Sequence, residues 1–314
     1  MPSISLPNAL PVKLSLATLV IAAALPTAHA TLLSSESFSA SDYPTAGVML
    51  QTDGGTATSP TVTGYTGNWV SPTDGNAFGT ANPQILSGSL SYGGANYLGS
   101  SGNSVGVLNN TTGGEITANN SGRTYRLLDS SLAVTDSTAG TLYLSFLFQS
   151  GQQTGATTYQ TLALYSGGTA DANRNFDAGL TTNGGQSGTA YNFGADNAYT
   201  STGVTADTGV HLFVVKLNLS ATAASDSVTV WVDPVLTGSG DPSGGSIVNS
   251  LNLTFDRLVL SDYDGNSAAW DEIRFGTTFE SVAAAIPEPS TYALFAGAAT
   301  LLGASARRPR RNPS

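Results

Sequence analysis

The chain has 314 residues, no cysteine, only 10% charged residues and a formal net charge of −10. This length fits one large domain or two small ones, and the lack of cysteine excludes thiol catalysis, thiolate metal sites and a disulfide framework. Between residues 31 and 286, twenty acidic side chains stand against six basic ones, so this region repels nucleic acid and anionic membranes.

The first thirty residues have the pattern of a secretory signal peptide. Lys13 and the amino terminus provide positive charge, and an apolar run of about a dozen residues covers 14–25. Ala28 and Ala30 then place small residues where a signal peptidase cuts. We expect export through the inner membrane and a processed chain that begins at Thr31.

The body, residues 31–285, reads as a series of short strands separated by Gly, Asn and Ser turns. Residues 142–148 are nearly all apolar, as in a strand that is buried on both faces. Other candidate strands are 162–165, 210–219, 227–232, 255–260 and 271–275. No segment has helical periodicity, so the body is predicted to be an all-β antiparallel sandwich or barrel.

Trp231 is the apolar residue whose position we expect to matter most. It alternates with Val230 and Val232, which places it on the opposite face of its strand. We expect Trp231 to be buried in the core, with Phe213 and Val215 of the preceding strand as partners.

Catalytic candidates are few. His211 is the only histidine after residue 30, it lies within an apolar strand, and no Gly-x-Ser-x-Gly elbow accompanies it. Asp271 and Glu272 are adjacent, so on a strand they point to opposite faces and cannot share a glycosidic bond. Arg274 shares a face with Glu272, which favours a structural ion pair. We expect no enzymatic activity.

Calcium is the one cofactor for which the sequence offers candidate ligands. Asp262, Asp264 and Asn266 form an oxygen-rich turn of the kind that calcium binds. The glutamate that closes an EF-hand loop is absent, and Asp/Asn/Gly turns also arise for backbone reasons alone. Both interpretations stay open at this stage.

Three segments combine aromatic rings with Asn or Asp groups, as sugar-binding sites do. They are residues 191–193, 196–199 and 68–69. Each is equally consistent with strand packing or a turn. The threonines do not form the regular ladder that ice binding would need.

The C-terminus has three consecutive parts. Pro287, Glu288 and Pro289 prevent any preceding helix or strand from continuing. The apolar run 292–306 then makes roughly 22 Å of helix at ~1.5 Å per residue, which is short for a bilayer core of about 30 Å. An arginine cluster that should remain cytoplasmic follows: Arg307, Arg308, Arg310 and Arg311.

This order of parts resembles the PEP-CTERM sorting signal of exopolysaccharide-producing Gram-negative bacteria, a tail also called an ice-binding protein C-terminal domain. The resemblance covers residues 286–314. It implies recognition by an exosortase-type membrane protease, an inner-membrane anchor before processing, and a final place in the cell envelope or outside the cell.

The body resembles the concanavalin A-like lectin/glucanase (laminin-G-like) jelly roll. Residues 211–219, 226–234 and 269–278 carry this resemblance, and the last of them implies a final strand that lies beside the first. The resemblance covers roughly residues 120–282 and leaves the fold of 31–119 open. Because this fold hosts lectins, glycosidases and structural modules, it does not determine function.

Three hypotheses remain from the sequence. The first is an exported, non-catalytic protein of the envelope or matrix that contacts exopolysaccharide or another glycan. The alternative is a carbohydrate-active hydrolase or lyase with a divergent active site, and a third is a matrix component without a ligand. The lack of a carboxylate motif favours the first and third.

Overall fold

The computed structural model describes residues 30–43, 60–70, 72, 83–93, 102–107, 122–151, 158–186, 188–195, 198–222, 224–236, 240–263 and 267–283. Ala28 and the whole sorting tail, with Pro287, Glu288, Pro289 and the arginine cluster, lie outside these ranges, whereas Ala30 is included and exposed. Among the described residues, none of the helices has the length and apolar character needed to cross a bilayer.

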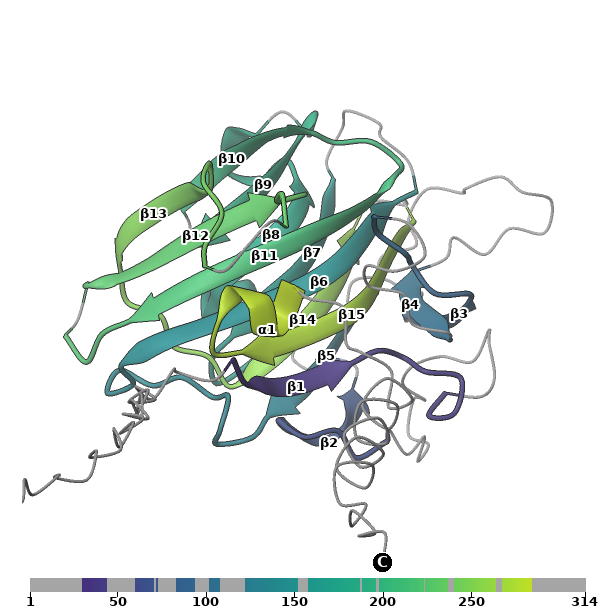
Figure 1. Cartoon of the computed structure of the whole chain (residues 1–314), viewed down its shortest axis with the longest axis horizontal. Coiled ribbons are helices and arrows are strands. Elements are labelled where there is room, and N and C mark those ends of the chain that lie inside the picture. Colours follow the sequence, from purple (N-terminus) through teal and green to yellow (C-terminus); the bar gives the residue numbers. More distant parts are fainter. Residues whose placement is uncertain are drawn as a thin grey trace, which may run out of the picture.

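Two antiparallel sheets form a β-sandwich, as the strand pattern predicted (Figure 1). The order of sheet I is β13 (Ser246–Leu251), β12 (Asp226–Val232), β11 (Val210–Leu219), β6 (Gly140–Ser150), β15 (Ala268–Gly276), β4 (Asn103–Val107) and β3 (Gln84–Ser87), and β1 (Leu32–Glu36) also pairs with β15. The order of sheet II is β10 (Ala198–Thr205), β9 (Ala190–Ala195), β8 (Arg174–Thr181), β7 (Tyr159–Tyr165), β14 (Arg257–Tyr263), β5 (Gly122–Leu128) and β2 (Tyr65–Val70).

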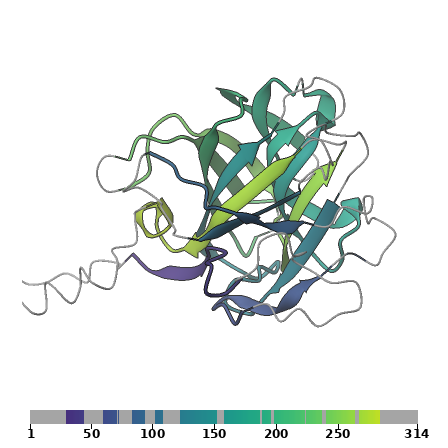
Figure 2. The same ribbon diagram turned by 90° about the vertical axis from the view of Figure 1, so that its right-hand side faces the viewer.

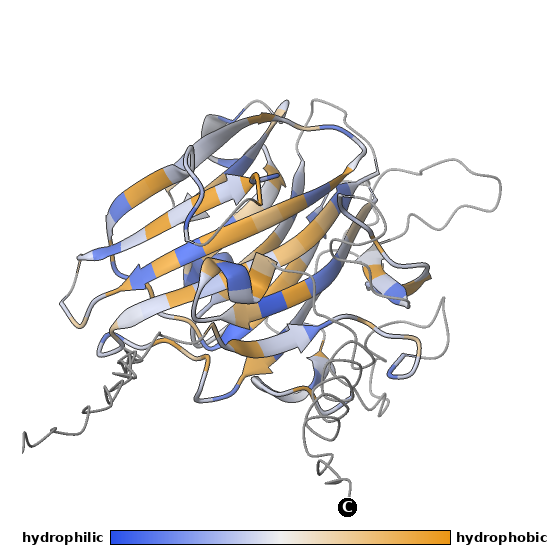
Figure 3. Cartoon of the chain, in the orientation of Figure 1, coloured by the Kyte–Doolittle hydropathy of each residue, from blue (hydrophilic) through white to orange (hydrophobic). Residues whose placement is uncertain are grey.

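The main core lies between the sheets and is built by alternate residues of their strands (Figure 3). Leu144, Phe146 and Phe148 of β6 point inward, and Phe146 stacks on Phe213 of β11 with ring centroids 5.0 Å apart. Phe148 makes an edge contact at 6.0 Å with Tyr191 of sheet II, which joins the two layers. Apolar burial of this kind contributes about 25 cal/mol per Å².

The outer face of sheet I carries a second apolar cluster beneath the short helix α1 (Phe279–Ala283). Trp231 is buried there, only 6% exposed, and its ring meets Phe279 edge-on at 6.0 Å. The prediction that Trp231 is buried was therefore right, but its predicted partners were wrong, since Phe213 and Val215 face the other side of the sheet. Because both faces are covered, β6 is apolar on both faces, as predicted.

The helix α1 is an element that the sequence pattern did not reveal. Its five residues are too few for helical periodicity to be visible. Thr278 begins it, because its side-chain oxygen accepts a hydrogen bond from the Ser281 amide at 3.2 Å. Figure 2 shows α1 outside β15, on the side of sheet I away from sheet II.

The segment before residue 120, whose fold the sequence left open, contributes strands to both sheets. β1 pairs antiparallel with β15, so the final strand does lie beside the first. β3 and β4 extend sheet I, while β2 pairs with β5 at the edge of sheet II. The N-terminal residues therefore complete both sheets of the sandwich.

A buried ion pair links this N-terminal segment to sheet II. Arg126 of β5 donates to Glu36 of β1 at 2.6 Å, and both side chains are 2% exposed. The same guanidinium donates to the backbone oxygens of Gly67 and Pro60 and lies 5.0 Å from the centre of the Tyr65 ring. Burial raises the pKa of Glu36 to about 7, and Arg126 opposes that rise.

Removal of one partner of this pair should destabilise the fold strongly. We expect Arg126→Met to lower the free energy of unfolding by about 3–5 kcal/mol, because Glu36 is left buried without its cation. The matched control is Arg257→Met, whose partner Asp256 is 43% exposed, and it should cost at most about 1 kcal/mol. Chemical denaturation measures both free energies of unfolding. If the two variants lose the same amount, burial does not make the Glu36 pair more important for stability than the exposed pair.

Candidate functional site

The outer face of sheet II carries a concentration of arginine and tyrosine side chains. Strand alternation sends Leu162 and Leu164 of β7 into the core and Tyr159 and Tyr165 outward. Three arginines on this face each lie over a tyrosine ring: Arg123 over Tyr165 at 5.6 Å, Arg174 over Tyr159 at 5.3 Å, and Arg257 over Tyr125 at 5.5 Å. Such contacts add attraction and hold the guanidinium planes in place.

A cavity of about 170 Å³ opens on this face. Its walls come from β5, β7, β8, β14 and the two 3-10 turns η1 (Asp171–Asn173) and η2 (Asn183–Gly185). The lining residues are Arg123, Tyr159, Asp171, Arg174, Asn183 and Tyr263. Tyr263 is 41% exposed, so it forms part of the open rim. We call this cavity the sheet II pocket.

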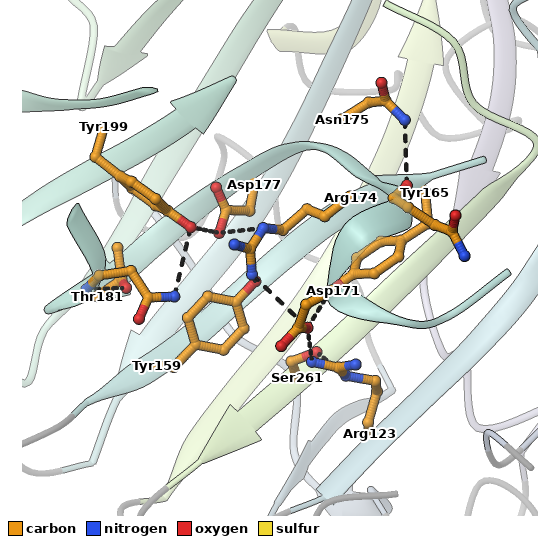
Figure 4. A network of polar contacts seen from close by, with 12 residues as sticks. Arg123, Tyr159, Tyr165, Asp171, Arg174, Asn175, Asp177, Thr181, Tyr199 and Ser261 are labelled. Atoms are coloured by element: carbon orange, nitrogen blue, oxygen red, sulfur yellow. Dashed lines mark hydrogen bonds and ion pairs between the residues drawn. The ribbon is translucent and has the colours of Figure 1, made fainter. Parts of the chain in front are cut away.

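Arg174 lies at the centre of the pocket's polar network (Figure 4). Its Nη1 donates to the hydroxyl of Tyr159 at 3.0 Å, and its Nε lies 3.7 Å from Asp177 Oδ2. The ring of Tyr199 lies 5.8 Å from the guanidinium, in addition to the ring of Tyr159. The cation is thus held by two aromatic rings and a carboxylate.

Asp171 forms the acidic wall of the pocket. Arg123, whose side chain is fully buried, donates to Asp171 Oδ1 at 3.0 Å and to the backbone oxygen of Thr169 at 2.8 Å. The Asp171 side chain is 54% exposed. A buried arginine therefore holds an exposed carboxylate at the mouth of the pocket.

Asp177 lies beneath the pocket with its side chain only 1% exposed. Tyr199 donates to its Oδ2 at 3.3 Å, while Oδ1 has no hydrogen-bond partner within the described part of the chain. Burial raises the pKa of Asp177, and Arg174 opposes the rise. Gly194 on the neighbouring strand leaves room for this carboxylate, because a Cβ there would lie 2.3 Å from Asp177 Oδ1 and would displace it.

The tyrosines of the pocket act as hydrogen-bonding and stacking groups. Burial raises the pKa of Tyr159 well above its usual range, and it raises that of Tyr199 in the same direction. Both hydroxyls therefore keep their protons at neutral pH and cannot act as general bases. The arrangement is suited to holding a polar ligand.

The structure places the three segments with sugar-binding chemistry in different environments. Tyr191 and Phe193 are fully buried between the sheets, and Trp69 is 3% exposed in the same core, so in these two segments the aromatic rings serve strand packing. In the third segment Asp196 and Asn197 lie outside the described residues. Tyr199, however, contributes to the network beneath the sheet II pocket.

His211 is held between two carboxylates. Its Nδ1 lies 2.6 Å from Asp233 Oδ2 and its Nε2 lies 2.9 Å from Asp207 Oδ1. The carboxylates contact opposite nitrogens of the ring, so the three groups do not converge on one ion. His211 is a packed residue at the end of a strand, with the Tyr191 ring 4.7 Å away, in agreement with the structural interpretation of the sequence.

The expected ion pair on the last strand is present. Glu272 Oε2 lies 2.6 Å from Arg274 Nη2, and both side chains are almost fully buried. The neighbouring Asp271 instead accepts hydrogen bonds from the hydroxyl of Ser89 and the amide of Leu90. Burial, together with the charge of Glu272, raises the pKa of Asp271 to about 8.

Of the calcium candidates, the structure describes only Asp262. It is fully buried, and burial raises its pKa well above the usual range. Asp264 and Asn266 lie outside the described residues, and within the described ranges no three acidic or histidine side chains are grouped to hold a metal.

Comparison with known proteins gives no family assignment, because no family model matches and no curated protein matches. Among solved structures, a carbohydrate esterase from Shiga toxin-encoding bacteriophage phi24B covers 80% of this chain and 100% of its own, with 13% identity and a TM-score of 0.44. The cellulose-induced protein Cip1 covers 67% and 90%, with 16% identity and a TM-score of 0.37. The botulinum neurotoxin serotype C1 binding domain covers 56% and 40%, with 10% identity and a TM-score of 0.33. These likenesses are too low to inform function.

His211 provides a direct test of the electrostatics described above. Burial opposes its protonation, but the hydrogen bonds with Asp233 and Asp207 outweigh burial and raise the pKa of His211 above about 6.5. The stability it contributes is fully present below about pH 6.5 and is lost as pH rises through the folded-state pKa. In NMR titration we expect a raised His211 pKa that Asp233→Asn lowers more than Asp207→Asn does. An unshifted wild-type resonance would contradict this geometry.

Proposed function

We propose that this chain is an exported, non-catalytic protein of the cell envelope or extracellular matrix that binds polysaccharide through the sheet II pocket of a concanavalin A-like jelly roll. The observation that carries the proposal is the composition of that pocket. Two arginines, an exposed carboxylate, an amide and tyrosine rings surround one cavity on a sheet face. These groups recognise hydroxyl-rich ligands, whose polar edges hydrogen-bond while their C–H faces pack on aromatic rings.

Individual residues have distinct roles in this proposal. The half-exposed Asp171 accepts hydrogen bonds from ligand hydroxyls, while Asn183 both donates and accepts. Tyr263, on the rim, provides a ring on which a sugar can lie. Arg123 acts indirectly, because it is fully buried and fixes the orientation of Asp171.

The placement of the two pocket acids supports the proposal of binding without catalysis. Hydrolysis of a glycosidic bond needs two carboxyl groups that face the substrate. Asp171 is accessible, but Asp177 is 1% exposed beneath Arg174 and cannot reach a sugar. The hydrolase or lyase alternative would need a second accessible acid or base, and the raised tyrosine pKa values do not supply one.

Export and sorting form the second part of the proposal. The signal sequence ending at Ala30 leads the chain across the inner membrane, and the tail from residue 286 holds it there until an exosortase-type protease processes it. Pro287, Glu288 and Pro289 present the extended peptide to that enzyme. A simple membrane anchor that is never processed would require only the apolar helix and the arginine cluster. It would give no reason for these three residues.

Glycan binding can be tested with immobilised polysaccharides. We expect the purified protein to be retained on at least one of them, and Asn183→Ala and Tyr263→Ala each to weaken retention about five- to tenfold, since each removes a direct contact. Ile247→Ala, an exposed position on sheet I, should have no effect and serves as the control. If neither pocket substitution weakens retention, the glycan binds outside the sheet II pocket. If the protein releases reducing sugars from the polysaccharide, the hydrolase alternative is correct.

The sorting signal can be tested separately in the cells that produce the protein. We expect replacement of Pro287, Glu288 and Pro289 by alanine to leave membrane insertion intact and to abolish processing, because the helix and arginines are unchanged. Cell fractionation and mass spectrometry give the location and the termini. A triple variant that reaches the medium at the wild-type size would exclude exosortase-type sorting.

A further inference from the structure

The sheet II pocket contains a cation whose hydrogen-bonding capacity is only partly used. Arg174 employs Nη1 on the hydroxyl of Tyr159 and Nε toward Asp177. Its Nη2 has no hydrogen-bond partner within the described residues. The Arg174 side chain is 11% exposed, so a group that reaches it from the cavity forms its contact in a largely desolvated place.

The two nearby acids do not satisfy this donor. Asp177 approaches Nε, and Asp171 lies 3.9 Å from Nη1 while making its shorter contact, 3.0 Å, with Arg123. Burial raises the pKa of Asp177, and the charge of Arg174 opposes that rise. The guanidinium itself stays charged at any physiological pH.

Arg174 is also held in position before any ligand arrives. The rings of Tyr159 and Tyr199 lie 5.3 Å and 5.8 Å from the guanidinium carbon, and Tyr199 is fixed in turn by its hydrogen bond to Asp177. A guanidinium fixed in this way loses little side-chain freedom when it binds an anion.

We propose that the ligand of the sheet II pocket is an acidic glycan, whose carboxylate or sulfate ester accepts a hydrogen bond from Arg174 Nη2. This inference rests on the proposed polysaccharide binding and specifies its chemical class. The body is strongly acidic, with twenty acidic and six basic side chains between residues 31 and 286. Most of that surface and Asp171 at the pocket mouth repel an anionic polymer, so its attachment depends on the contact with Arg174.

The test compares charged and uncharged oligosaccharides of matched length. The probes are oligogalacturonates, oligoglucuronates and sulfated galacto-oligosaccharides, each with its uncharged counterpart. We expect wild-type protein to bind one anionic class at least about tenfold more tightly than its counterpart. The class that is bound identifies the anion as carboxylate or sulfate.

The deciding variant is Arg174→Gln combined with Asp177→Asn, which removes the cation without leaving a buried unpaired carboxylate. It should bind charged and uncharged probes equally. Arg257→Gln removes another arginine that lies over a tyrosine on the same sheet but outside the pocket, and it should keep the preference. If thermal unfolding shows that the double variant does not fold, Arg174→Lys, which keeps the charge but lacks Nη2, should reduce the preference instead.

The outcomes separate this inference from the proposed function. Equal wild-type binding of charged and uncharged probes, or a preference that survives loss of Arg174, overturns the inference and leaves polysaccharide binding in place. Binding of none of the probes, charged or uncharged, overturns both.

Discussion

The cover on both faces of sheet I is the constraint on which the proposed binding face depends. The inner face of sheet I packs on sheet II, while its outer face is covered by α1 and by Leu90 and Leu236 around Trp231. Among the described residues, the outer face of sheet II carries only a small apolar cluster, formed by Ala163, Tyr165 and Val259 with Tyr125 beside them. Its larger side chains there are polar and aromatic, and this is why the proposed ligand is placed on sheet II.

The few charged residues of the body are arranged in pairs, and two of these pairs lie at the sheet II pocket. Each of the six basic residues of the body has an acidic partner: Arg123 with Asp171, Arg126 with Glu36, Arg174 with Asp177, Lys216 with Asp241, Arg257 with Asp256 and Arg274 with Glu272. Two of these pairs, those of Arg126 and Arg274, are buried on both sides, because a desolvated charge requires a partner. The Arg126 pair joins β5 to β1, whereas the Arg274 pair lies within β15. The pairs of Arg123 and Arg174 meet at one cavity. Among the described residues, the cavity thus gathers a third of the body's cations.

The strand pattern predicted the sandwich and the two-sided burial of β6, because alternation and apolar runs are local signals. The position of the last strand beside the first is a long-range property, and it was expected only from the resemblance to the concanavalin A-like jelly roll. The partners of Trp231 were predicted wrongly, since the pattern showed which face it occupies but not that α1 covers this face. The pocket itself was missed, although one candidate sugar-binding segment contained Tyr199, which belongs to the network beneath the pocket. Its residues come from six elements between Arg123 and Tyr263, and only the strand pairing brings them together. The available signal was the recurrence of Arg and Tyr at alternate positions of β5, β7 and β14.

The position of α1 has a consequence for how the domain is displayed. Ala283, the last residue of the helix, is buried against sheet I, so the chain leaves the sandwich on the side away from the pocket. If the tail from residue 286 is anchored as proposed, at most about 30 Å of chain separates Ala283 from residue 292, at roughly 3.5 Å per residue. The proposed anchor would then hold sheet I toward the bilayer, and the arginine and tyrosine face of sheet II would point away from the membrane.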